Sequence, residues 1–148
     1  MRSNELIEFS KELEHIKAFL NIENVDDETG LVVEYQTEEL DFRIPPLTVE
    51  PLVENAVIHG IGTLESGGVI TVSSKKTDGG YTVCVEDNGV GFDVEHTELG
   101  VGLENAKTRL ESQCGGKLSF ESRPGCTKAM VFVPDPKSPN DKTAFKRG

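Results

Sequence analysis

Residues 45–62 read PPLTVEPLVENAVIHGIG, and this stretch decides the fold. Its apolar residues recur at helical spacing, at Val49, Leu52, Val53, Ala56 and Val57. The spacing predicts a helix with one continuous apolar face, regular from about Glu50 because of Pro51 and ended by Gly60 and Gly62. Asn55 points away from that face, with Glu54 a quarter turn beside it and His59 one turn above. Such a helix is typical of the floor of a polar site, although a plain amphipathic surface helix has the same pattern.

A second stretch, Val83 to Phe92, reads VCVEDNGVGF and favours the polar site. An alternating strand ends there at Asp87, whose carboxylate is held rigidly and can accept a hydrogen bond from an exocyclic amine. Gly89 and Gly91 follow, and they allow tight turns and close approach of a ligand because they have no Cβ. Each of these features alone is weak, since an acid followed by two glycines is often only a loop.

Two further features add chemistry. Gly100 and Gly102 immediately precede a predicted helix, so free backbone N–H groups and the helix dipole offer a seat for phosphate. Asn55 can give a neutral oxygen to Mg²⁺, which prefers oxygen ligands and retains most of its waters. Glu54 beside it can orient or deprotonate a nucleophile.

Composition sets the outer limits. The chain has 148 residues, enough for one domain, and a formal net charge of −11, which disfavours nucleic-acid binding. A single polyphosphate held by a divalent cation remains compatible with that charge. The three cysteines have no CxxC spacing and are interpreted as reduced packing residues. No apolar run reaches membrane-spanning length.

The remaining segments predict an α+β fold. A helix is expected over about 10–24, with Leu13, Ile16 and Leu20 on one stripe and His15 as a surface residue. A second helix is expected from about Leu103 to Cys114. Residues 37–44 are interpreted as a charged connection. Strands are expected at 31–35, 69–73, 81–86, 117–122 and 127–133, with the late ones paired as hairpins. These elements predict a two-layer sandwich with about five strands and helices on one face.

In this order and spacing, the set of motifs resembles the ATP-binding domain shared by DNA gyrase, heat-shock chaperone, histidine kinase and MutL ATPases. Glu54-Asn55 matches the N box, Asp87 to Gly91 the DxGxG box, and Gly100 to Leu103 the second glycine box. Gly125-Cys126-Thr127 is similar to the late Gly-x-Thr. Residues 51–60, PLVENAVIHG, together with ELEHIK at 12–17 and GLENA at 102–106, are most similar to LytS-like sensor histidine kinases. The resemblance covers about residues 10 to 134.

The resemblance implies a Bergerat-type ATP-binding fold with a mixed sheet, and it assigns roles to residues. Glu54 and Asn55 would be catalytic, and Asn55 would also hold Mg²⁺. The nucleotide-binding residues would be Asn55, His59, Asp87, Gly89, Gly91, Gly100, Gly102, Leu103, Asn105 and Thr127. Thr127 would help to hold the adenine.

The resemblance also implies an organisation and partners. Residues 1–24 would end a linker from a phosphoacceptor region, residues 25–134 would form the catalytic domain, and residues 135–148 would be a flexible tail. ATP and Mg²⁺ would be the ligands, and the acceptor a histidine on an upstream helix, dimeric in the full-length kinase. A response regulator would act downstream, and no nucleic acid is expected. The expected location is a cytoplasmic domain of an integral membrane sensor.

Some positions depart from the family pattern. His15 lacks the context of the family's phosphorylated histidine, so we expect no self-phosphorylation there; either the segment is part of a larger membrane sensor or it lacks that activity. Ile58 stands where the family often has a basic residue, and residues 24–28 are acidic where an arginine is usual. The lid, Asp93 to Leu99, is short, which fits the kinase class.

Two other interpretations remain open. One is a stand-alone serine kinase or ATPase of the same superfamily, like the anti-sigma-factor kinases. The other is a non-catalytic nucleotide-binding interaction module. The presence of Glu54, Asn55, Asp87 and all four glycines argues against the second.

Overall fold

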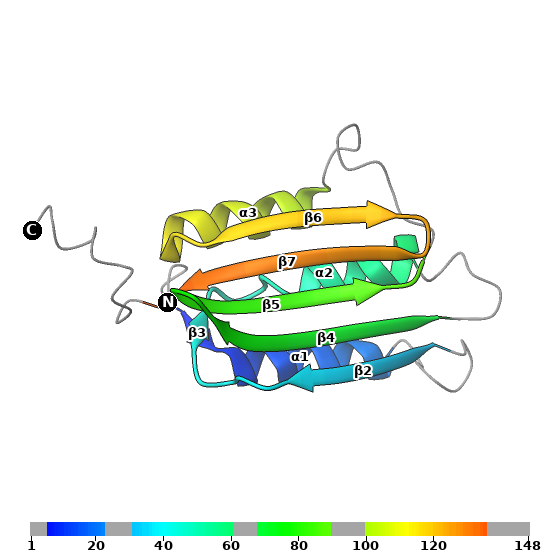
Figure 1. The fold of residues 1–148 in the computed structure, drawn as a ribbon, viewed down its shortest axis with the longest axis horizontal. Helices are drawn as coiled ribbons and strands as arrows, with labels where there is room; N and C mark the ends of the chain where they lie inside the picture. Colours follow the sequence, from blue (N-terminus) through cyan, green and yellow to red (C-terminus); the bar gives the residue numbers. More distant parts are fainter. Residues whose placement is uncertain (1–5, 23–30, 61–67, 90–99, 136–148) are drawn as a thin grey trace, which may run out of the picture.

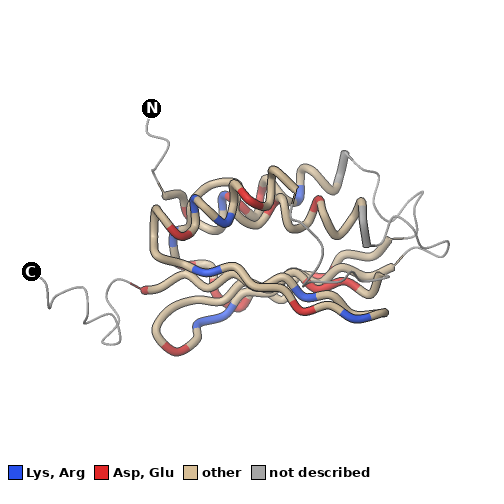
Figure 2. Tube along the Cα trace, turned by 90° about the horizontal axis from the view of Figure 1, so that it is seen from above, with Lys and Arg blue, Asp and Glu red and all other residues tan. Residues whose placement is uncertain are grey.

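Three helices lie on one face of a five-stranded sheet (Figures 1 and 2). The computed structural model describes residues 6–22, 31–60, 68–89 and 100–135. The helical layer contains α1 (Phe9–Ile22), α2 (Glu50–Asn55), a π-helical turn η1 (Ala56–Gly60) and α3 (Val101–Cys114). The sheet contains β2 (Val32–Thr37), β4 (Val69–Thr77), β5 (Gly80–Asp87), β6 (Lys117–Arg123) and β7 (Cys126–Pro134). The predicted α+β sandwich is confirmed.

The sheet has the strand order β2-β4-β5-β7-β6. Hairpins join β4 to β5 and β6 to β7, as predicted, through Asp78-Gly79 and Pro124-Gly125. Gly79 and Gly125 have φ of 83° and 86°, a region that favours glycine. β2 runs parallel to β4, whereas the other neighbours are antiparallel. The sheet is therefore mixed, with β5 at its centre between β4 and β7.

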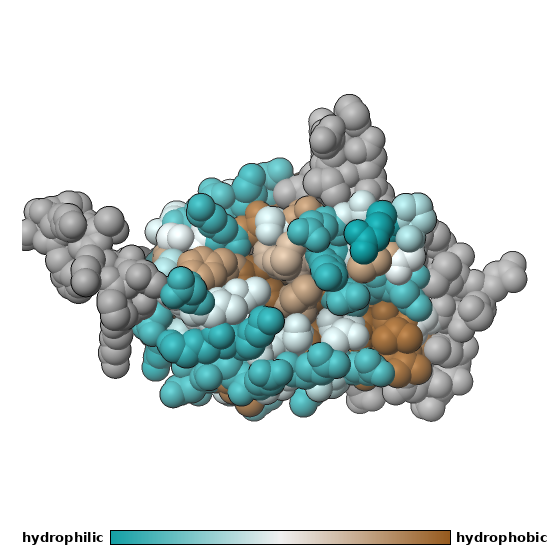
Figure 3. Space-filling model, in the orientation of Figure 1, coloured by the Kyte–Doolittle hydropathy of each residue, from teal (hydrophilic) through white to brown (hydrophobic). Residues whose placement is uncertain are grey.

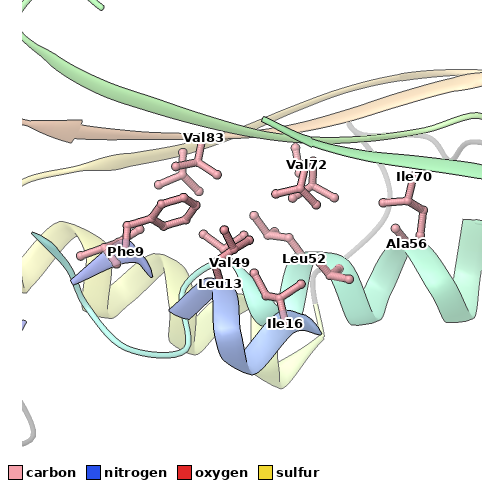
Figure 4. Packing of buried hydrophobic residues seen from close by; sticks show 14 of the residues in the cluster. Phe9, Leu13, Ile16, Val49, Leu52, Ala56, Ile70, Val72 and Val83 are labelled. Carbon is pink, nitrogen blue, oxygen red and sulfur yellow. The ribbon is translucent and has the colours of Figure 1, made fainter. Parts of the chain in front are cut away.

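The core fills the space between the two layers. α1 contributes Phe9, Leu13 and Ile16, and these side chains face Val72 and Val83 of the sheet (Figure 4). The stretch around α2 contributes Val49, Leu52, Val53 and Ala56, all buried, so the predicted apolar face is confirmed. α1 therefore packs into the same hydrophobic core as the other helices and the sheet.

The helix at residues 50–60 changes character after Asn55. It is α-helical over Glu50–Asn55, with Pro51 tolerated in the first turn, and π-helical over Ala56–Gly60. Within η1, Ile58 is 59% exposed, whereas Ala56 is buried. An apolar repeat of 3–4 residues cannot signal such a π-helical turn, and π-helical turns occur frequently at functional sites.

One pair of short strands was missed. β1 (Ile7–Glu8) pairs antiparallel with β3 (Arg43–Ile44), within the stretch expected to be a charged connection. Two-residue strands are too short to show alternation, so the sequence gives no signal for them. α1 begins directly after β1, at Phe9, and Phe9 stacks on Phe42 at 4.9 Å between ring centroids.

None of the helices in the described segments covers the other face of the sheet. It is mainly hydrophilic, with a hydrophobic patch over the beginnings of β2 and β4 (Figure 3), where Val32 and Val69 are paired. Among the described residues, no helix is both long and apolar enough to cross a membrane.

Candidate functional site

Asp87 and Thr127 form the centre of the site. They are direct partners on the antiparallel strands β5 and β7, so their side chains project from the same face of the sheet. Both are buried, and both face the helical layer, as do Val85 and Ala129 two residues along the same strands. The strands therefore bring together an acid and a threonine that lie 40 positions apart in sequence.

Asp87 is 5% exposed as a residue. Burial raises the pKa of Asp87, the Gly89 amide lowers it, and the charge of Glu86 raises it. The Gly89 N–H donates to Oδ1 at 2.9 Å. Among the described residues, no hydrogen bond engages Oδ2. A carboxylate oxygen with lone pairs left over is suited to accept a hydrogen bond from a ligand.

The backbone that follows Asp87 is fixed from two sides. The Asn88 carboxamide Oδ1 accepts the Val69 N–H at 2.9 Å, which ties the end of β5 to the start of β4. The Gly125 N–H donates to the Gly89 carbonyl at 3.0 Å, which joins the β6–β7 turn to the same loop. Gly91 and the predicted lid, Asp93 to Leu99, lie outside the described residues.

Glu54 and Asn55 lie at the end of α2 and are half-buried. η1, which follows them, contacts β5, and Ala56 lies beneath Ile70 (Figure 4), the ladder partner of Asp87. Glu54 and Asn55 are thus carried to the same end of the molecule as Asp87 (Figure 1). The backbone of His59 lies in η1, and its side chain is outside the described residues. Burial and the charges of Glu12 and Glu54 raise the pKa of Glu50, one turn before Glu54.

α3 begins beside this end of the sheet. Gly100 is the N-cap of α3 and has no side-chain cap. A Cβ built on Gly100 or Gly102 would meet no atom within 4 Å among the described residues, so packing there does not require glycine. The first amides of α3 can bind an anion, because the N-terminus of a helix carries unpaired N–H groups and the positive end of the helix dipole. Leu103 is buried in the core, and Asn105 is exposed on α3.

Two residues of the site were not predicted. The Ser122 hydroxyl is 2.7 Å from the Thr127 hydroxyl, across the β6–β7 hairpin. Asn88 was noted only as part of a motif, yet its side chain holds the edge of β4. The pairing of Ser122 with Thr127 could have been found by extending the register of the Pro124-Gly125 turn backward along both strands.

The polar groups at this end of the molecule suit a nucleotide with a divalent cation. They comprise a buried acid for an amine, a hydroxyl, open helix amides for phosphate, and an asparagine amide for a cation. No group of three or more His, Cys, Asp or Glu side chains in the described part of the chain could hold a metal ion. Mg²⁺ commonly retains several waters and binds phosphate oxygens, so one asparagine oxygen from the protein is compatible with such a cation.

The fold and the site together define an ATP-binding domain. The chain belongs to the family of histidine kinase-, DNA gyrase B- and HSP90-like ATPases, whose profile matches residues 47–137. The resemblance drawn from the motifs is confirmed by this match and by the relatives below.

Relatives of known sequence and structure agree. The chain is 36% identical to the uncharacterized protein YwpD of Bacillus subtilis (strain 168), over 84% of the chain and 49% of YwpD. It is 33% identical to the sensor protein LytS of Oceanobacillus iheyensis, over 76% of the chain and 22% of LytS. The chain thus spans about half of the first and about a fifth of the second. The histidine kinase domain of a blue-light activated kinase from Erythrobacter litoralis has the same fold, with a TM-score of 0.70 at 20% identity, covering 90% of this chain and 64% of that one.

Proposed function

We propose that this chain is the ATP-binding catalytic region of a two-component sensor histidine kinase, which transfers the γ-phosphate of ATP to a histidine on an upstream helix. The observation that carries the proposal is the buried Asp87, opposite Thr127, at the end of the molecule that also contains Glu54 and Asn55. The identity with LytS over most of the chain favours a sensor kinase over the other members of the family.

The adenine would be held by Asp87 and Thr127. Asp87 Oδ2 would accept a hydrogen bond from the exocyclic amine of adenine, and the apolar side chain of Leu103 would contact the ring. Gly89 and Gly91 would let the backbone approach the nucleotide. The amides at Gly100 and Gly102 would bind phosphate oxygens, with His59 and Asn105 as further polar contacts.

Asn55 and Glu54 would divide metal binding from chemistry. Mg²⁺, when bound, neutralises charge on the phosphates. Asn55 would hold it through its amide oxygen. Glu54 would accept the proton of one imidazole nitrogen while the other nitrogen bonds to the γ-phosphorus. The bond from that phosphorus to the bridging oxygen would break, and ADP would leave with the electron pair.

The organisation of the natural protein forms part of the proposal. Residues 1–24 would connect to a dimeric phosphoacceptor region, residues 25–134 would form the catalytic domain, and residues 135–148 a tail. The kinase would be a membrane sensor with this domain in the cytoplasm, and a response regulator would receive the phosphate. His15, which is exposed on α1, would not be the acceptor.

The test separates binding from transfer. Calorimetric titration of the wild-type chain, Asn55→Ala and Glu54→Gln with ATP is carried out with Mg²⁺ and with a chelator. Asn55→Ala should weaken Mg-ATP much more than metal-free ATP, because the lost contact belongs to the metal. Glu54→Gln should bind normally but lose about 10²–10⁴-fold in phosphate transfer to a histidine-bearing helix supplied by the longer protein or in trans.

Either of two results would contradict the proposal. A wild-type chain that does not bind ATP in Mg²⁺ removes the proposed function altogether. Transfer by Glu54→Gln at the wild-type rate removes the catalytic role of Glu54. Transfer to a serine of a separate protein, with none to histidine, would instead support the anti-sigma-factor type of kinase.

A further inference from the structure

Glu12 is a buried acid of α1 that is not among the residues assigned to ATP. Its side chain is completely buried in α1 and reaches across to the segment before α2. Its Oε1 accepts the Leu47 N–H at 3.0 Å, and its Oε2 accepts the N–H groups of Val49 at 2.9 Å and Glu50 at 3.1 Å. No lysine or arginine of the described segments pairs with it. Three amides therefore compensate a charge whose burial would otherwise be very unfavourable.

These hydrogen bonds replace a local helix cap. Val49 is the N-cap residue of α2, and no side-chain cap is formed there. A Ser, Thr or Asp at position 49 would satisfy the first amides from within the segment, but Val49 is fully buried in the core. The start of α2 is therefore fixed by a side chain of another helix, 37 positions earlier.

Arg109 of α3 holds the same segment from the opposite side. Its Nη2 donates to the Leu47 carbonyl at 2.5 Å. Leu47 has a φ of 61° and is 50% exposed, so neither backbone preference nor side-chain burial explains its conformation. A non-glycine residue in this region persists where its surroundings determine it, and here the determinants are Glu12 and Arg109.

The geometry points to Glu12 as a positioning residue for the ATP site. We define the clamp as Glu12 and Arg109 together with the residues 47–50 that they hold. α2 has six residues, so Glu54 and Asn55 lie only about 6–8 Å along the helix axis from the clamped end. A displacement of that end is carried to both side chains, whereas Asp87 and Thr127 belong to the sheet and are not moved. This inference rests on the proposed function.

The test uses Glu12→Gln, which has almost the same shape. The glutamine oxygen can still accept hydrogen bonds either from Leu47 or from Val49 and Glu50. The NH₂ group then takes the place of the other carboxylate oxygen and faces backbone N–H groups, which are also donors. Calorimetric titration should show Mg-ATP affinity lowered on the order of tenfold or more, because Asn55, the proposed Mg²⁺ ligand, moves with the clamped end of α2. Affinity for metal-free ATP, which depends on the sheet residues, should change by less than about threefold.

Leu20→Ala is the matched control. Leu20 is buried in the last turn of α1, about two turns after Glu12, and forms none of the hydrogen bonds of the clamp, so the variant should melt at a lower temperature with an unchanged ratio of the two affinities. Arg109→Met, which removes the hydrogen bond to Leu47, should change the ratio in the same direction as Glu12→Gln. Arg109→Lys, which retains a donor, should restore it.

The outcomes distinguish this inference from the proposed function. Absence of Mg-ATP binding by the wild-type chain removes the function on which the inference rests. If the wild type binds and Glu12→Gln lowers both affinities equally, or if Leu20→Ala changes their ratio as much, the positioning role is wrong. If Glu12→Gln does not fold, the Arg109 pair decides, and equal ratios in Arg109→Met and Arg109→Lys would refute the clamp.

Discussion

At Asp87, the stability of the nucleotide-free domain and the proposed binding of ATP make opposite demands on one side chain. Its carboxylate is buried with one amide donor, and burial raises its pKa above that of an unfolded aspartate. The ionised form is therefore disfavoured in the folded domain without nucleotide. Such unfavourable groups are common where a ligand supplies the missing partner.

Asp87→Asn should therefore stabilise the nucleotide-free domain at neutral pH and weaken ATP binding. A raised folded pKa means that the contribution of Asp87 to stability is fully present below its unfolded pKa and is lost as the pH rises through the folded pKa. The stability advantage of the variant should thus be largest at neutral pH and shrink as the pH falls through the folded pKa. Urea unfolding at several pH values measures this, and calorimetry measures the loss of affinity.

The exposed acid Glu111, changed to Gln, controls for the general loss of one negative charge. An Asp87→Asn variant that is less stable than the wild type at neutral pH, or that binds ATP equally well, would show that Asp87 is a structural acid.

At the level of single residues, the sequence predicted the acid and the threonine but not how they are supported. Asp87 could be recognised because it ends a strand and precedes glycines, both local features. Glu12 could not be recognised, because its three partners lie 35 to 38 positions away and their amides carry no side-chain signal.

Strands β5 and β7 approach each other closely where β5 begins. A Cβ on Gly80 would lie 2.2 Å from the Val133 carbonyl oxygen and 2.9 Å from the Phe132 ring. Gly80 begins β5 opposite Pro134, so the strands approach closely at this point. Backbone atoms cannot move aside as a flexible side chain can.

Gly80→Ala should therefore lower the free energy of unfolding by about 1–3 kcal/mol, the usual range for overpacking. Gly102→Ala is the matched change, because a Cβ at that position of α3 meets nothing within 4 Å among the described residues. It should leave stability unchanged or raise it by up to about 1 kcal/mol. Equilibrium unfolding in urea compares the two, and a Gly80→Ala variant as stable as Gly102→Ala would contradict the close approach.

At the level of elements, the sequence predicted periodic segments well and their partners less well. The apolar stripe at Val49, Leu52 and Val53 and the hairpin at Asp78-Gly79 followed from local pattern. The parallel pairing of β2 with β4 did not, because it depends on where the chain returns after α2. The change from α-helix to π-helix after Asn55 was also invisible in the pattern.

The whole molecule carries a formal net charge of −11. Charges of one sign repel within the folded domain more than in the expanded chain, and salt screens that repulsion with a Debye length of about 10 Å at 0.1 M. The melting temperature should therefore rise with sodium chloride concentration. A variant with Glu34, Glu38 and Glu111, all exposed, changed to glutamine should show a smaller rise. Calorimetric melting of both proteins at several salt concentrations measures this, and equal salt dependence would exclude global repulsion as the cause.

At this scale, the sequence was most informative. The five strands of the large sheet and the layer of helices followed from periodicity and turn residues, since such patterns are local and recur along the chain. The sequence did not predict the short strands β1 and β3 or the stacking of Phe9 of α1 on Phe42. These features depend on contacts between segments that are individually too short to show a pattern.

The two tyrosines give the aromatic packing a practical consequence. The chain has no tryptophan, so its ultraviolet emission comes from Tyr35 and Tyr81 alone. The Lys17 ammonium of α1 lies 4.8 Å from the Tyr35 ring centroid, and Tyr81 stacks at 4.6 Å on Phe42, which in turn stacks on Phe9 of α1. Both fluorophores therefore lie along the seam between α1 and the sheet, and neither belongs to the ATP site. The unlabelled protein thus carries its own optical probe, because a shift of α1 on the sheet would change the surroundings of both tyrosines.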